Sequence, residues 1–133
     1  MIFIDTGAFL SRFIVNDSYH KKSLSLWKKI ESKKIICYTS NFIIDELATL
    51  LLRRTGADFC YDKINRIYES PKFNILRPTK ENELNALELL KKYSDQEISF
   101  TDCISFDLIK SNRIQKAFTF DKHFSYVGIA IFN

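Results

Sequence analysis

Residues 1–5 of the chain, MIFID, place an uninterrupted apolar run directly before an aspartate, and this junction decides the fold. A short apolar run is typical of a strand buried on both faces, as the strands of parallel sheets are. Similar runs predict further strands at residues 35–38, 73–76, 116–120 and 127–132. The chain therefore has four or five segments suited to a buried sheet.

Segments with apolar residues at helical spacing lie between these strands, at residues 8–15, 20–32, 42–54, 58–68, 79–93 and 100–111. This alternation predicts a three-layer α/β fold, with a central, mainly parallel sheet of four to five strands and helices on both faces. In the fifth helix, Leu84, Leu87 and Leu90 share the face expected to be buried. The 133 residues show no repeat or linker, so one domain over residues 1–133 is expected.

Composition narrows the function classes. The net charge of +4 suits a polyanionic partner without identifying one. Cys37, Cys60 and Cys103 lack metal-ligand spacing and are expected to be reduced, buried thiols rather than a zinc site. No apolar run reaches the roughly 18–20 residues of a membrane span. The N-terminus lacks a signal-type pattern, so a cytoplasmic protein without membrane association is expected.

Four acidic residues are predicted to meet at one edge of the sheet. Asp5 and Asp121 each follow a predicted strand directly, and ligands of open α/β sheets bind outside the carboxyl ends of the strands. Glu46 and Asp102 lie near the starts of predicted helices, which emerge at the same edge. The four carboxylates are therefore expected to converge.

Each acid also has a purely structural interpretation. Asp5 is a possible helix cap, Asp102 a possible capping-box partner of Ser99, and Asp121 a possible turn residue. Glu46 is a possible solvated helix residue. For each acid taken singly, the structural role is more common than a functional one. If all four acids had only structural roles, their shared location at one edge of the sheet would be a coincidence.

Neighbouring polar residues fit the cluster less well. Asp45 is turned ~100° from Glu46 on a helix. Asp107 is five residues beyond Asp102 and is expected to be a solvated helix residue. His20 and His123 have no evident nucleophile partner and are expected to be surface or loop residues.

Clustered carboxylates indicate a particular chemistry. Two carboxylates ~4 Å apart repel by roughly 4 kcal/mol at an effective dielectric constant of 20, so such a group retains protons or binds a cation. An all-oxygen ligand set suits Mg²⁺ or Mn²⁺. One or two such ions, completed by water, can hydrolyse a phosphodiester.

The chain resembles the PIN-domain family, and within it the VapC-type toxins of prokaryotic toxin–antitoxin pairs. The resemblance rests on IDTGAFL (residues 4–10), SNFIIDEL (40–47), SFTDCISF (99–106) and FTFDKHF (118–124). Their order and spacing cover nearly the whole chain. The segment FTD before a helix, followed by a strand ending in TFDKHF, is the most specific part.

The resemblance implies a Mg²⁺- or Mn²⁺-dependent ribonuclease acting on single-stranded RNA, which forms a homodimer and is blocked by a cognate antitoxin. The catalytic and metal-binding residues it implies are Asp5, Glu46, Asp102 and Asp121, supported by Thr6 and Thr101. Many relatives carry Ser where this chain has Gly7, which removes one possible supporting hydroxyl.

Two alternatives stay open. The first is a PIN-like module that binds nucleic acid or protein without cutting. The second is a phosphatase of the haloacid type. Those enzymes have a DxD motif after the first strand, but this chain has Gly7 where the second acid of the motif would be. Several basic residues have two open interpretations: they contact an RNA backbone, or they only form the solvent-exposed faces of helices. They are Lys28, Lys29, Lys33, Lys34, Arg53, Arg54 and Lys122.

Overall fold

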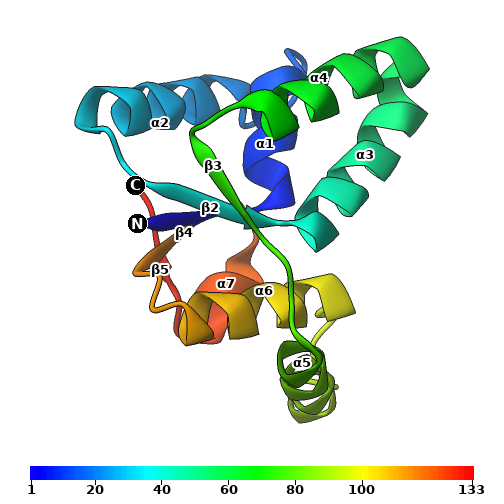
Figure 1. Cartoon of the computed structure of the whole chain (residues 1–133), viewed down its shortest axis with the longest axis vertical. Helices are drawn as coiled ribbons and strands as arrows, with labels where there is room; N and C mark the ends of the chain where they lie inside the picture. The colour runs from blue at the N-terminus through cyan, green and yellow to red at the C-terminus, as the bar shows by residue number, and fades with distance from the viewer.

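A computed structural model describes residues 1–133 (Figure 1). Five strands form one sheet in the order β3-β2-β1-β4-β5, and every neighbouring pair is parallel. The strands are β1 (Ile2–Ile4), β2 (Cys37–Ser40), β3 (Phe73–Leu76), β4 (Lys116–Phe118) and β5 (Ala130–Ile131). The predicted parallel sheet is confirmed, with β1 at its centre.

Seven helices cover the sheet. They are α1 (Thr6–Phe13), α2 (His20–Lys33), α3 (Asn41–Thr55), α4 (Ala57–Glu69), α5 (Lys80–Lys92), α6 (Phe100–Ser111) and α7 (Lys122–Tyr126). Helices α1 to α4 lie on one face and α5 to α7 on the other (Figure 1). The three-layer α/β fold predicted from the sequence is therefore confirmed. No helix combines the length and apolar character needed to cross a bilayer.

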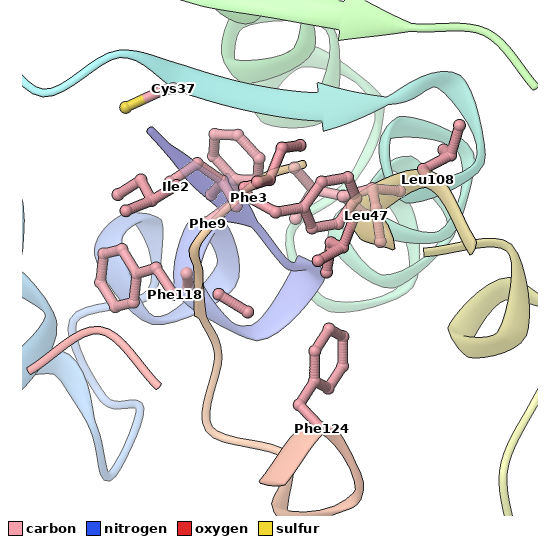
Figure 2. Packing of buried hydrophobic residues seen from close by; sticks show 14 of the residues in the cluster. Ile2, Phe3, Phe9, Cys37, Leu47, Leu108, Phe118 and Phe124 are labelled. Carbon is pink, nitrogen blue, oxygen red and sulfur yellow. The ribbon is translucent and has the colours of Figure 1, made fainter. Parts of the chain in front are cut away.

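One hydrophobic core joins the layers. The side chains of β1 are entirely inside, and Figure 2 shows Phe3 gathered with Phe9 of α1 and Leu47 of α3. On the α1 side the core is aromatic, since the Phe9 and Trp27 ring centroids lie 5.6 Å apart. The indole nitrogen of Trp27 also donates to the Ala8 carbonyl at 3.1 Å, which fastens α2 to α1.

The end of β4 differs from the prediction. The strand stops at Phe118 rather than at residue 120, and Asp121 caps the short helix α7, which the sequence did not predict. Asp121 consequently does not follow the strand directly. Thr119 does, and its hydroxyl donates a hydrogen bond to the carboxylate of Asp5.

Two other expectations about burial were wrong. Leu84 and Leu87 are 54% and 52% exposed, because α5 lies at the border of the molecule and buries Ala86 instead. Cys37 and Cys103 are buried free thiols, as expected, whereas Cys60 is half-buried.

Asp107 is buried rather than solvated, which corrects the sequence prediction. Its Oδ2 accepts a hydrogen bond from Asn82 Nδ2 at 2.8 Å and a longer one from Asn85 Nδ2 at 3.4 Å. Asn82 also completes the capping box of α5, where its Oδ1 accepts from the Thr79 amide at 2.9 Å. One asparagine thus starts α5 and joins it to α6.

Asn82→Ala should lower the free energy of unfolding by about 2–4 kcal/mol, because it removes both the capping-box bond to Thr79 and the closest partner of a buried carboxyl. Urea denaturation measures the change. Asn85→Ala is the matched control and should cost less than about 1 kcal/mol, since Asn85 is exposed and makes only the longer bond. Equal losses in the two variants would contradict the assignment.

Candidate active site

The strand order creates a topological switch point between β1 and β4. The chain first builds β1, β2 and β3 in one direction and then returns to place β4 on the other side of β1. Helices leave the two neighbouring strands toward opposite faces there, and such a switch point is where open α/β sheets bind ligands. Asp5 follows β1 and Thr119 follows β4, with the Asp5 amide donating to the Phe118 carbonyl at 3.1 Å.

Asp5 lies at the carboxyl end of β1 and is only 6% exposed. It occupies the N-cap position of α1, but its side chain makes no capping bond, so the helix-cap interpretation is wrong. Its Oδ2 instead accepts from the Thr119 hydroxyl at 2.6 Å. Burial raises the pKa of Asp5 to about 7; the Thr119 bond opposes this, while the charges of Asp102 and Glu46 add to it.

Asp102 combines a structural role with a place in the cluster. It forms the predicted capping box, in which Ser99 N donates to Asp102 Oδ2 at 3.1 Å and Asp102 N donates to Ser99 Oγ at 3.1 Å. Burial raises the pKa of Asp102, and the charges of Asp121 and Glu46 raise it further. Its Oδ1 makes no hydrogen bond within the protein, so one oxygen of the carboxylate stays available.

Glu46 faces the other acids, and Asp45 does not. Glu46 is half-buried on α3, and its charge raises the pKa of both Asp5 and Asp102. Asp45 is exposed. The structure thus brings together all four carboxylates that the sequence singled out.

His123 belongs to the same cluster, which the sequence did not predict. It is the second residue of α7, with a side chain 17% exposed, rather than a surface or loop residue. Its Nδ1 lies 2.9 Å from Asp121 Oδ1, which also accepts the His123 amide at 2.9 Å. Ligand atoms of Asp102, Asp121 and His123 all lie within 4.8 Å of one another.

Threonines and an asparagine surround the acids. Thr119 joins two of them, because its hydroxyl donates to Asp5 and accepts from the Asp121 amide at 3.0 Å. The hydroxyl of Thr6, a predicted supporting residue, is buried and has no hydrogen-bond partner within the protein. The same is true of the side-chain oxygen of Asn41 at the start of α3. Thr101, also predicted, is half-buried beside Asp102. Thr119 and Asn41 were missed; Thr119 stood inside an overlong predicted strand.

These residues fit a hard divalent cation. Neighbouring carboxylates help to raise the pKa of Asp5 and Asp102, and no lysine or arginine pairs with any of the four acids, so the cluster is short of positive charge. The orphaned Thr6 hydroxyl adds an unused oxygen at the same edge. Lys33 and Lys34 do not serve the site, since they precede β2 and so lie at the opposite, amino edge of the sheet.

Comparison with known proteins finds consistent relatives. The family model of the PIN domain matches residues 2–130. The 23S rRNA-specific endonuclease VapC20 of Mycobacterium tuberculosis, in strains CDC 1551 / Oshkosh and H37Rv, is 33% identical over 128 residues, covering 96% of this chain and 95% of the relative. A crystal structure of M. tuberculosis VapC20, described as a sarcin–ricin loop cleaving toxin, superposes with a TM-score of 0.89 at 31% identity, over 98% of this chain and 97% of that one.

Asp5→Asn should change how stability depends on pH. The folded-state pKa of about 7 lies above the ordinary 3.8, so the stability that protonated Asp5 contributes is complete below pH 4 and is lost as the pH rises through 7. Without divalent metal, the variant should therefore gain about 2–3 kcal/mol relative to wild type between pH 5 and pH 8. Urea denaturation in EDTA measures this, with the exposed Asp45→Asn as control. A pH-independent difference would contradict the burial argument.

Thr119→Val should weaken Mn²⁺ binding by about 10- to 100-fold, as loss of a bond that orients a ligand does, whereas Thr119→Ser should keep it. Isothermal titration calorimetry gives the affinities. Thr39→Val is the matched control, because the Thr39 hydroxyl is equally buried but donates to the Ile4 carbonyl rather than to an acid. Equal weakening in the control would show that the effect is general loosening.

Proposed function

The chain belongs to the PIN-domain family, as a member of the VapC type, and on that basis we propose that it is a Mg²⁺- or Mn²⁺-dependent endoribonuclease, the toxin of a toxin–antitoxin pair. The observation that carries the proposal is the convergence of Asp5, Glu46, Asp102 and Asp121 at the switch point of the sheet. The names of the relatives support a structured RNA with an accessible loop as the substrate.

Asp5, Asp102 and Asp121 would hold the metal, with Glu46 completing the set. When bound there, the ion would supply an activated water as the nucleophile and would offset charge on the leaving oxygen. The protein prepares this by fixing each acid. Ser99 occupies one oxygen of Asp102, and His123 occupies one oxygen of Asp121, so a single oxygen of each is left for the cation.

Thr119 fixes Asp5, the third of the aspartates that would hold the metal. It donates to Asp5 Oδ2 and accepts from the Asp121 amide, so Asp5 and the start of α7 keep a constant separation. A cation bound nearby would favour the ionised form of Asp5, since a positive charge stabilises the carboxylate. The hydrogen bonds of Thr119, Ser99 and His123 hold the acids in place before substrate arrives.

Membership of the VapC type also supports a small cognate antitoxin as partner, a homodimeric state and a cytoplasmic location. The exposed Leu84 and Leu87 of α5 support the dimer, because they form an apolar stripe one helical turn long that no other part of the chain covers. The non-cutting binding module has no specific support, since all four acids are present and brought together.

Asp5→Asn and Asp102→Asn should each reduce cleavage of RNA by more than the about 10- to 100-fold that loss of a supporting contact costs, because each removes a metal ligand. Cleavage of a labelled RNA in Mg²⁺ or Mn²⁺ is the measurement, and EDTA should abolish it. Asp45→Asn is the matched control and should cut normally. Full activity in both site variants, with their folds intact, would refute the proposed function.

A further inference from the structure

A pair of aromatic rings lies on one side of the acids. Phe100 is in the first turn of α6, two residues before Asp102, and is 38% exposed. Phe42 lies in the first turn of α3, one helical turn before Glu46. The two rings meet edge to face, with centroids 6.4 Å apart. This pair therefore joins the starts of the two helices that carry Glu46 and Asp102.

A second pair lies beside the other two acids. Tyr19, 47% exposed, stacks on Phe120 with centroids 4.3 Å apart and an angle of 8° between the rings. Phe120 directly precedes Asp121, and its ring lies 3.9 Å from the position a Cβ would take at Gly7. Since Gly7 is two residues past Asp5, this second pair covers the first turn of α1.

Both pairs have the same construction. The inner ring, Phe42 or Phe120, is half-buried and packs against the hydrophobic core, whereas the outer ring, Phe100 or Tyr19, is exposed. A fixed inner ring holds the outer ring in one orientation. The fold gains little from an exposed outer ring, so its position beside the acids needs another explanation.

We propose that Phe100 and Tyr19 are stacking platforms for unpaired RNA bases on the two sides of the phosphodiester held at the acids. The inference rests on the proposed function and deepens it. Aromatic faces stack any base, and a base is free to stack only where it is not already paired in a helix. Together the two platforms would select single-stranded or looped RNA with little preference for sequence.

The chemistry of the edge favours a nucleic acid over an apolar protein partner as the occupant. Each pair is close in the sequence to acids of the cluster, and an apolar protein surface seated on the rings would have to bury those carboxylates without compensation. A nucleotide chain would instead present a phosphate to a cation at the acids and flat apolar bases to the rings.

The test is binding of a short single-stranded RNA that carries 2-aminopurine, with every protein variant in the Asp102→Asn background so that the RNA stays intact. Phe100→Leu and Tyr19→Leu should each weaken binding about 5- to 100-fold, because leucine keeps the apolar volume but has no flat ring. Phe100→Trp and Tyr19→Phe should bind as the parent does. Tyr61→Leu is the matched control, since Tyr61 is 73% exposed on α4 and should have no effect.

An RNA with one abasic nucleotide identifies the mechanism. When the missing base is the one that stacks, the abasic RNA should bind the parent protein as weakly as intact RNA binds Phe100→Leu. Combining the abasic RNA with the Phe100→Leu protein should add no further loss of affinity. Parent-like binding by both leucine variants, or additive losses with every abasic RNA, would overturn the inference. Metal-dependent cleavage by the wild-type chain is measured alongside, so the platforms can fail while the proposed function stands, or the reverse.

Discussion

The site is organised around a carboxylate that is buried at the end of the central strand, where its charge is unfavourable. Asp5 ends the central strand and is almost fully enclosed, which raises its pKa to about 7. An isolated ionised group in such a place would be prohibitively costly. The Thr119 hydroxyl, at 2.6 Å, offsets part of that cost and links the end of β1 to the residue that follows β4. A short parallel sheet is thus built around a group whose charged form a nearby cation would favour.

Capping and metal binding are not competing explanations here. Asp102 begins α6 through its capping box, and Asp121 begins α7 through the His123 amide. A capping carboxylate is held at a helix start by one oxygen, which leaves the other free and its direction fixed. The switch point gathers such helix starts at one edge. Local helix chemistry therefore positions the acids, and topology supplies their convergence.

The sequence predicted the sheet, its parallel direction and the four acids, because buried strands and strand-end aspartates leave strong local patterns. It missed contacts that depend on how segments meet. Thr119 could not be distinguished from the apolar run before it, since its role rests on a hydrogen bond to Asp5, which is far away in the sequence. Asp107 was expected in solvent because helical spacing shows which residues share a face but not that α5 supplies two amides to that face. His123 was missed because no periodicity marks a helix of five residues.

Charge raises a difficulty that the aromatic rings resolve. The chain is basic overall, yet Lys33 and Lys34 lie at the amino edge of the sheet, and no lysine or arginine pairs with the acids. Without a bound cation, the four carboxylates would repel the phosphates of an RNA. Contacts that hold a base without using charge do not depend on that cation. Phe100 and Tyr19 would supply such contacts beside the acids, so binding of the bases and activation of the phosphate can rest on separate interactions.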